Sequence, residues 1–465
     1  SAERIATPTF ETSHTMTRIL QSHIAGQWVG REAAATLRSA INGQAVAATH
    51  AEALDFAAAV DHARRVGVPA LMAMDFQERA QRLKALAKLL MEHKEALYAV
   101  SAHTGATRAD GWIDIEGGSS TLFAYASVGS NELPSGNVLH EGPAMPLGKK
   151  GGFAGTHILV PRGGVAVHIN AFNFPIWGLL EKFAPSFLAG MPCIGKPATA
   201  TSYLTEAAVR IMLDSGLLPP GALQLVIGGT GNLLDQLDGA DVVTFTGSAD
   251  TAAKLRVHPN LVRQSVPFNA EADSLNCAIL AEDVSPDDEE FDLFVKEVAR
   301  EMTTKAGQKC TAIRRAIVPR KHLDAVAEKL RARLAKTVVG DPSIEGVRMG
   351  ALASKDQQAD VAERVAQLSK CADVVFGEKD GLMWFGDSNP DTAMRRTFVT
   401  DYRNPVTVKK IVDLNVNDRY NDIGNPVMRQ LPNGSNVIRQ NGDEIFLTGI
   451  GASPQGDRPF FRRMN

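Results

Sequence analysis

The stretch that decides the fold opens with Val165-Ala166-Val167-His168-Ile169, a short apolar run of the kind that forms a buried β-strand. From Gly164 to Asp250, runs of this kind alternate with helical patterns. The strand patterns cover residues 165–169, 192–195, 223–227 and 242–245, and the helical patterns cover residues 177–188, 203–213 and 233–237. This alternation predicts an α/β fold with a doubly wound parallel sheet.

Polar residues and glycines stand where these strands end. Asn173, Lys196, Gly229 and Gly247 all fall at such positions. Ligands of doubly wound sheets bind in the crevice beyond the carboxyl ends of the strands. The sequence therefore predicts a dinucleotide site at this edge of the sheet.

The rest of the chain adds helices before this sheet, a second α/β segment after it and a β-rich end. Helices are predicted over residues 51–74, 75–98, 114–128, 291–305, 323–334 and 356–368, and strands over 22–30 and 316–318. Residues 132–156 are rich in Gly and Pro, which suits an extended hairpin arm. From about Glu378 short strand patterns take over, with turn signals at Asn433-Gly434 and Asn441-Gly442.

Composition excludes several classes of protein. The 465 residues suffice for two or three domains, and a net charge of −3 argues against nucleic acid or an anionic membrane as the main partner. No apolar run is long enough to cross a bilayer. The four cysteines show neither metal-ligand spacing nor a disulfide framework, which fits a reducing cytoplasm. Residues 1–15 are interpreted as either an artificial leader or a disordered lead-in, with Met16 as the expected natural start.

Cys310 is the strongest candidate for chemistry. In Ala306-Gly307-Gln308-Lys309-Cys310-Thr311 it can act as a thiolate nucleophile toward a carbonyl group. The Asn173 amide and the Cys310 backbone N–H would stabilise the oxyanion, and Glu271 would activate water as a general base. Taken singly, each residue has an ordinary structural interpretation, and we prefer that interpretation for the remaining cysteines, Cys193, Cys277 and Cys371.

In this order, His168–Pro175, Ile194–Thr199, Asn269–Ser274 and Ala306–Thr311 resemble the signature of the aldehyde dehydrogenase superfamily. The resemblance covers residues 24–377. It implies a cofactor domain over residues 16–131 and 157–270, an oligomerisation arm over 132–156 and an incomplete catalytic domain over 271–377. It also implies a homodimer without a metal, and oxidation of an aldehyde by NADP or NAD.

The resemblance further assigns the cofactor-binding residues. They are Asn170, Ala171, Phe172, Lys196, Ala198, Thr199, Gly229, Phe245, Thr246, Gly247, Ser248 and Ala272. Family members often carry a carboxylate three positions after the lysine, where this chain has Thr199. The missing negative charge removes repulsion against a 2′-phosphate, which favours NADP over NAD.

Within the superfamily, Thr104–Arg108, Trp112–Gly118, Asn170–Pro175 and Glu271–Asn276 resemble the branch that oxidises CoA-linked semialdehydes in aerobic aromatic degradation. That branch implies a CoA-linked aliphatic semialdehyde as substrate. Glu271 favours water rather than CoA as the acceptor of the acyl group, because relatives that acylate CoA typically lack this base.

The resemblance fails after Gly377, where the family's Glu-x-Phe-Gly-Pro segment is missing. Residues 378–465 instead resemble part of the β-propeller of prolyl-oligopeptidase-type peptidases, through Tyr420–Pro426 and Gly449–Asp457. The peptidase's nucleophile elbow is absent, so no peptidase activity is expected. A chimeric chain would leave the catalytic sheet with exposed apolar edges. The alternative function is a non-catalytic nucleotide-binding or interaction protein whose site is disabled by this atypical tail.

Overall fold

The computed structural model describes residues 17–149, 152–368, 373–376, 382–389, 393–401, 404–430 and 436–464. The chain forms two compact units. The first comprises residues 1–276, 301–314 and 339–355, and the second comprises residues 277–300, 315–338 and 356–465. The segment around Cys310 therefore belongs to the same unit as Asn173 and Glu271.

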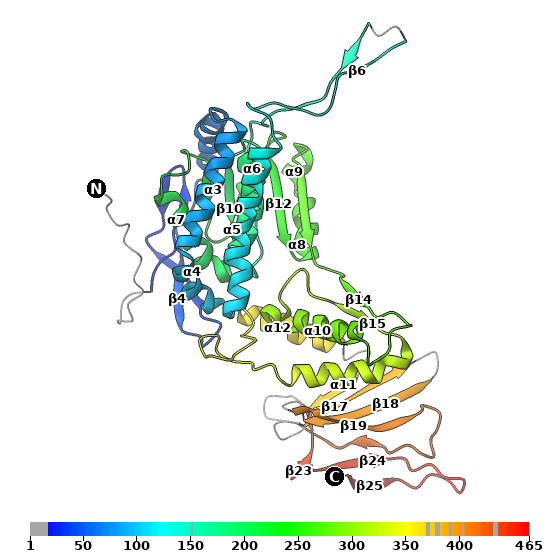
Figure 1. Cartoon of the computed structure of the whole chain (residues 1–465). Coiled ribbons are helices and arrows are strands. Elements are labelled where there is room, and N and C mark those ends of the chain that lie inside the picture. The colour runs from blue at the N-terminus through cyan, green and yellow to red at the C-terminus, as the bar shows by residue number, and fades with distance from the viewer. Residues whose placement is uncertain are drawn as a thin grey trace. The chain divides into compact units, whose positions relative to one another are not determined.

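A seven-stranded sheet organises the first unit (Figure 1). Its strands, in spatial order, are β13 (Phe268–Ala272), β12 (Val242–Gly247), β9 (Ala166–Ile169), β10 (Cys193–Lys196), β11 (Leu223–Leu225), β1 (Ser22–Ile24) and β2 (Gln27–Val29). The five strands from β9 to β13 are parallel, and β1 and β2 add antiparallel edges. The chain winds from β9 toward β11 and then returns to β12 on the other side of β9, which confirms the doubly wound sheet.

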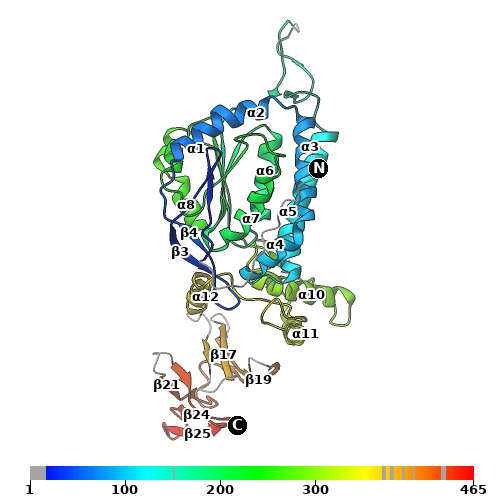
Figure 2. The same cartoon turned by 90° about the vertical axis from the view of Figure 1, so that its left-hand side faces the viewer.

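Helices cover both faces of this sheet (Figure 2). One face carries α3 (Phe76–Glu92), α4 (Lys94–Ser101), α5 (Arg108–Asn131), α6 (Trp177–Leu188) and α7 (Ser202–Asp214). The other carries α1 (Phe56–His62), α8 (Ala249–Arg256) and α9 (Pro259–Arg263). Strand residues alternate between the two cores: Ala166 and Cys193 pack on the first face, and Val167 and Ile194 on the second.

Several elements differ from the sequence prediction. The helix expected over residues 51–74 is split by a π-helical turn, Ala63–Gly67, before α2 (Val68–Met72). The segment at residues 233–237 is a short 3₁₀ helix, Leu233–Gln236. The hairpin of β3 (Ala33–Arg38) and β4 (Ala45–His50) was not predicted, because its alanine-rich strands lack a clear apolar alternation. The helix α5 starts at Arg108 rather than 114, because Thr107 and Asp110 form a capping box there.

The expected arm is a two-stranded ribbon that projects from the first unit (Figure 1). Its pairs join β5 (Leu139–His140) to β8 (Ile158–Leu159), and β6 (Met145–Pro146) to β7 (Ala154–Gly155). Large apolar side chains on it are exposed, with Phe153 at 68% and Met145 at 57%.

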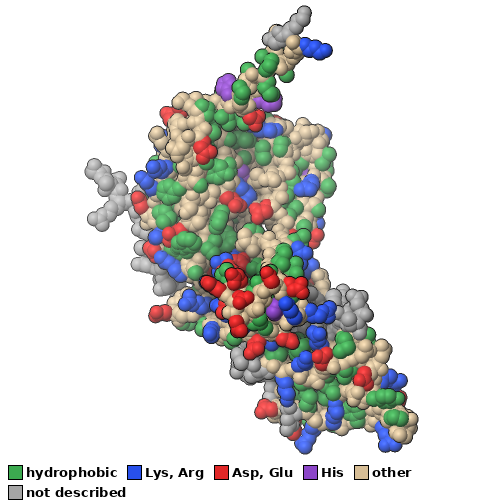
Figure 3. Space-filling model, turned by 45° about the vertical axis from the view of Figure 1, so that its right-hand side comes forward, with side chains coloured by type: hydrophobic (Ala, Val, Ile, Leu, Met, Phe, Trp, Pro, Cys, Tyr) green, Lys and Arg blue, Asp and Glu red, His purple; other side chains and the backbone are tan. Residues whose placement is uncertain are grey.

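The second unit begins with a small α/β part. Parallel strands β14 (Cys277–Ile279) and β15 (Arg315–Ile317) lie with helices α10 (Glu289–Thr303), α11 (Leu323–Leu334) and α12 (Lys355–Leu368). Within the described residues β14 and β15 pair only with each other, and their facing side chains Ile279 and Ile317 are 68% and 50% exposed. Acidic side chains gather over the start of α10 (Figure 3), where negative charge favours a helix N-terminus.

Among the described residues, the expected all-β segment forms three antiparallel sheets. Strands β16 (Asp373–Phe376), β17 (Leu382–Asn389), β18 (Met394–Asp401) and β19 (Asn404–Asn415) make a meander. The second sheet contains β20 (Asn425–Pro426), β23 (Gln440–Asn441), β24 (Glu444–Gly449) and β25 (Phe460–Met464), and β21 (Met428–Gln430) pairs with β22 (Asn436–Ile438). The turn at Asn441-Gly442 is present, with Gly442 at φ 66°, whereas Asn433-Gly434 lies outside the described residues.

Candidate active site

The carboxyl ends of β9 and β10 bring Asn170 and Lys196 together. The Asn170 backbone N–H donates to the Lys196 carbonyl at 2.9 Å. Asn170 is 4% exposed, yet neither its amide nitrogen nor its amide oxygen has a hydrogen-bond partner in the described chain. Buried polar groups are normally paired, so this unpaired amide is suited to a ligand.

Lys196 offers a positive charge beside this amide. Burial lowers the pKa of its ammonium group, and no ion pair to a described carboxylate offsets that burial. A 3₁₀ turn, Thr199–Thr201, begins three residues later. Thr199 and Ala198 are half-buried at the mouth of this edge.

The third part of the edge is the turn after β12. Gly247 ends the strand and Ser248 caps α8, its hydroxyl accepting from the Thr251 N–H. Thr246 has a buried hydroxyl oxygen with no described partner. Phe245 is 4% exposed within the core, and any side chain at position 247 would strike its ring. We therefore expect Phe245 to support Gly247 rather than to contact a cofactor.

The remaining cofactor candidates lie nearby along the chain. Ala171 and Phe172 follow Asn170 and are half-buried, Gly229 is exposed in the loop after β11, and Ala272 is half-buried at the end of β13 opposite Gly247. A dinucleotide requires hydrogen-bonding groups, positive charge and a helix N-terminus. The site supplies them through the Asn170 amide, the Thr246 hydroxyl, Lys196 and the capped start of α8. The residues present therefore fit such a cofactor.

Residues 170–176, here called the amide loop, carry Asn173 from β9 to α6. The Thr201 hydroxyl donates to the Phe172 carbonyl at 2.9 Å before Asn173. After it, Asp114 accepts from the Ile176 and Trp177 N–H groups at 3.0 and 2.8 Å. The half-buried side-chain amide of Asn173 forms no hydrogen bond with a described residue, so it is available to a reacting oxygen.

Residues 304–312, here called the nucleophile loop, carry Cys310. Lys305, Ala306 and Gly307 are consecutive left-handed residues, with φ of 52°, 52° and 72°. Lys305 and Ala306 therefore have a backbone conformation that non-glycine residues rarely adopt. The Cys310 carbonyl accepts from the Asn276 amide at 2.6 Å.

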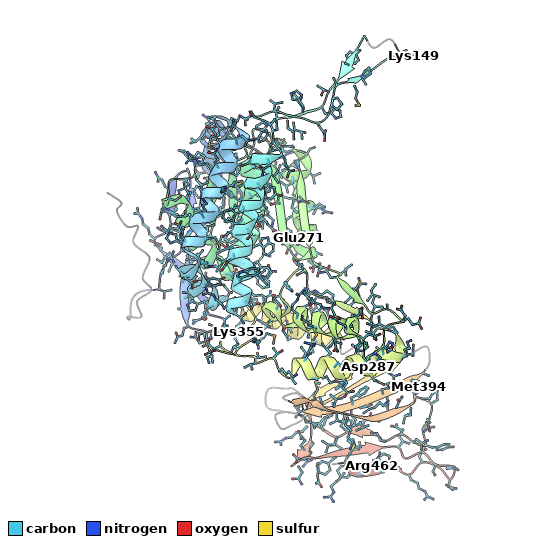
Figure 4. The ribbon with its side chains drawn as sticks, viewed as in Figure 1. Lys149, Glu271, Asp287, Lys355, Met394 and Arg462 are labelled. Carbon is cyan, nitrogen blue, oxygen red and sulfur yellow. The ribbon has the colours of Figure 1, made fainter. Side chains whose placement is uncertain are left out.

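The Cys310 thiol and Glu271 are direct neighbours. Glu271 is exposed near the end of β13, as Figure 4 shows. Cys310 is exposed as a residue, but dehydration of its sulfur is the first cause that raises the thiol pKa. The neighbouring Glu271 carboxylate raises that pKa further. The thiol is therefore neutral at rest and already faces a base.

The other cysteines occupy different environments. Cys193 is fully buried in β10, where burial strongly raises the pKa of its thiol. Cys277 is exposed at the start of β14, and Cys371 lies outside the described residues. Neither Cys193 nor Cys277 has a carboxylate neighbour of the kind that Cys310 has.

Sequence reasoning missed the residues that hold the two loops. Asp114, Thr201 and Asn276 each bond a loop from a distant segment, and the fold alone brings these segments together. The only available signal was the placement of Asp114 and Asn276 inside motifs that carry the family likeness.

No helix in the described part of the chain combines the length and apolarity that a membrane crossing requires. No group of three or more His, Cys, Asp or Glu side chains in the same residues could hold a metal ion.

Comparison with known proteins agrees with this architecture. The Aldehyde dehydrogenase family matches residues 28–403, which extends past Gly377, where we expected the resemblance to end. The chain is 46% identical over 360 residues to 3,4-dehydroadipyl-CoA semialdehyde dehydrogenase of Aromatoleum evansii, covering 77% of this chain and 70% of that protein.

A more distant relative and a solved structure are also similar to the chain. Succinate-semialdehyde dehydrogenase [NADP(+)] of Escherichia coli is 28% identical over 69% of this chain and 64% of its own length. The structure of an NAD-dependent benzaldehyde dehydrogenase from Corynebacterium glutamicum has a TM-score of 0.66 at 22% identity, covering 77% of this chain and 76% of that one. The chain belongs to the aldehyde dehydrogenase family.

Proposed function

We propose that this protein oxidises a CoA-linked aliphatic semialdehyde to its carboxylic acid, with NADP as hydride acceptor. The observation that carries the proposal is the position of the Glu271 carboxylate beside the Cys310 thiol, where it raises the pKa of that thiol. A thiol beside a carboxylate that can take its proton is the arrangement of an activated nucleophile.

In the first step Glu271 takes the thiol proton and the Cys310 sulfur attacks the aldehyde carbon. A C–S bond forms and the carbonyl oxygen becomes an oxyanion. The Asn173 amide, unpaired in the described chain, and the Cys310 backbone N–H donate to that oxyanion. Such aimed donors typically contribute about 10²–10³-fold to the rate.

NADP, when bound, would supply the hydride acceptor. Loss of hydride from the substrate carbon would then leave a thioester on Cys310. Glu271 first releases the thiol proton to solvent and then removes a proton from water, and the oxygen attacks the thioester carbon. The C–S bond breaks, the acid leaves, and the Cys310 thiolate takes a proton back from Glu271. General-base assistance of this kind is worth about 10²–10⁴-fold.

Asn170, Lys196, Thr246 and Ser248 would hold the cofactor. The unpaired amide and hydroxyl supply donors and acceptors, and the Lys196 ammonium supplies charge toward phosphate or ribose oxygens. Thr199 places no negative charge against a 2′-phosphate, which favours NADP over NAD.

The 46% identity to an enzyme named for a CoA-linked semialdehyde supports the substrate class. A non-catalytic nucleotide-binding protein is less well supported, because it has no chemical need for a thiol placed beside a carboxylate. The peptidase likeness of residues 378–465 stays a prediction. Because the Glu-x-Phe-Gly-Pro segment is missing, we expect the chain with this tail to turn over weakly.

We also propose a cytoplasmic homodimer. A thiol nucleophile needs a reducing compartment. The exposed apolar side chains of the arm, including Leu147, Phe153 and Ile158, suit contact with a second copy of the chain. Light scattering of the wild type and of Phe153→Asp tests this: the variant is expected to have half the mass, and an unchanged mass contradicts the arm's role.

The activity is tested by following NADPH absorbance with the purified chain, NADP or NAD, and a panel of simple and CoA-linked aldehydes. We expect turnover with CoA-linked semialdehydes and its loss in Cys310→Ala. Cys277→Ala is the matched control, since Cys277 is an exposed cysteine without a carboxylate neighbour. Turnover that survives Cys310→Ala would refute the mechanism.

A further inference from the structure

A buried polar cluster at the start of α5 reaches both loops of the active site. Lys305 and Asp110 are each 3% exposed, as is Asp114, and Thr104 beside them is 1% exposed. A charged cluster this deeply buried is costly unless its geometry serves a purpose.

One side of this cluster fixes the nucleophile loop. The Lys305 backbone N–H donates to Asp110 at 2.7 Å, and its ammonium donates to the Thr104 hydroxyl at 2.7 Å. Asp110 is itself oriented by the Thr107 N–H and hydroxyl, at 2.9 and 2.8 Å. Lys305 is also the first of the left-handed residues that lead to Cys310, so these bonds hold the loop where its backbone is strained.

The other side fixes the amide loop. Asp114 lies one helical turn after Asp110, so both carboxylates face the same side of α5. Asp114 binds the two N–H groups that end the amide loop, and it attracts the buried ammonium of Lys305. Burial disfavours each charge alone, raising the pKa of Asp114 and lowering that of Lys305, and the pair offsets part of this cost.

We propose that Asp114 and Lys305 are positioning residues that set Asn173 against Cys310. They attach the amide loop and the nucleophile loop to the same turn of α5. The inference rests on the proposed oxidation chemistry. A misplacement of about 1 Å between reacting groups can cost roughly 10²-fold in rate, so two loops from distant segments need a common anchor.

A double-mutant cycle tests the amide loop. Asn173→Ala and Asp114→Ala should each lower kcat for the aldehyde by roughly 10²-fold, with KM for NADP changed less than about threefold. If Asp114 acts through Asn173, the double variant should be hardly slower than Asn173→Ala alone. Asp114→Asn keeps an oxygen acceptor for the two N–H groups and should retain turnover within about fivefold of the wild type. Losses that multiply in the double variant, or Asp114→Asn as slow as Asp114→Ala, would overturn the proposal.

A second measurement needs no turnover and so separates this inference from the proposed function. The rate of Cys310 alkylation by iodoacetamide is followed by mass spectrometry in the wild type, Lys305→Met and Lys94→Met. Lys94 lies on α4 and pairs with Glu116 of α5 but touches neither loop, which makes it the matched control. We expect Lys305→Met to alkylate at least about fivefold faster, because the thiol relaxes away from the Glu271 charge, and Lys94→Met to match the wild type.

If Lys305→Met does not fold, Lys305→Gln, which keeps a neutral donor, is measured instead with the same expectation. Equal rates in the Lys305 and Lys94 variants would overturn the positioning role. An absence of aldehyde turnover in the wild type would count against the proposed function alone, since the alkylation rates are still read.

Discussion

The Cys310 thiol lies beside the Glu271 carboxylate, although the two residues come from separate segments of the chain. The contact raises the thiol pKa, and dehydration of the sulfur raises it more. A neutral thiol beside a base differs from a preformed thiolate, because the thiol proton must leave before the sulfur attacks. The reactivity of Cys310 should therefore depend on pH.

Replacing Glu271 by Gln should move the alkylation profile of Cys310 to lower pH. Because the folded thiol pKa lies above its ordinary value of 9.0, thiolate forms only as the pH rises past that value. Removing the negative charge lowers the pKa of the Cys310 thiol. Thiolate therefore forms at lower pH, and iodoacetamide reacts faster at pH 8. Glu181→Gln is the control, since Glu181 is the smallest of the causes and should give a smaller shift in the same direction. An unmoved midpoint in Glu271→Gln would contradict the contact.

The same variant should separate the two halves of the reaction. With no base to activate water, the thioester on Cys310 persists, so one equivalent of NADPH forms in a burst and the steady-state rate falls by roughly 10²–10⁴-fold. Rapid-mixing absorbance measures both phases. A steady-state rate equal to that of the wild type would remove Glu271 from the water step.

Asn170→Ala should weaken cofactor binding without destabilising the free protein. Its buried amide makes no hydrogen bond in the described chain, so its removal costs no partner and relieves an unpaired polar group. We expect an unchanged or higher Tm without cofactor, and a Kd for NADP about tenfold weaker. Calorimetry and fluorescence titration measure the two quantities. A lower Tm with normal binding would show that the amide serves the fold instead.

Much of the fold was predictable because its signals are local. The buried strands of the parallel sheet are continuous apolar runs, and the predicted helix over residues 177–188 matches α6. The β3–β4 hairpin was missed because its pairing, rather than its composition, defines it. The anchoring of Cys310 by Asn276, and of the amide loop by Asp114, depends on contacts between distant segments, which no periodicity in the sequence reveals.

Thr199→Glu should shift cofactor preference toward NAD. A carboxylate at the start of the 3₁₀ turn would repel the 2′-phosphate of NADP, while the ribose hydroxyls of NAD could donate to it. We expect kcat/KM with NADP to fall by roughly tenfold or more relative to that with NAD. Thr199→Gln, similar in size but uncharged, is the control and should keep the wild-type preference. Equal losses with both cofactors in Thr199→Glu would show that this position does not read the phosphate.

The paired strands β14 and β15 should make the second unit prone to self-association. Ile279 and Ile317 face each other on them and are largely exposed, on a two-stranded sheet with open edges in the described chain. Ile279→Thr with Ile317→Thr keeps β-branched side chains but removes apolar area, so light scattering during mild heating and binding of an apolar dye should both fall. Val361→Thr on α12 removes a comparable exposed group, 47% exposed, away from any strand edge, and should change neither signal. If the double variant aggregates as readily as the wild type, the open edge of this sheet is not the cause of aggregation. That result would also mean that the atypical tail leaves no sticky apolar surface at these strands.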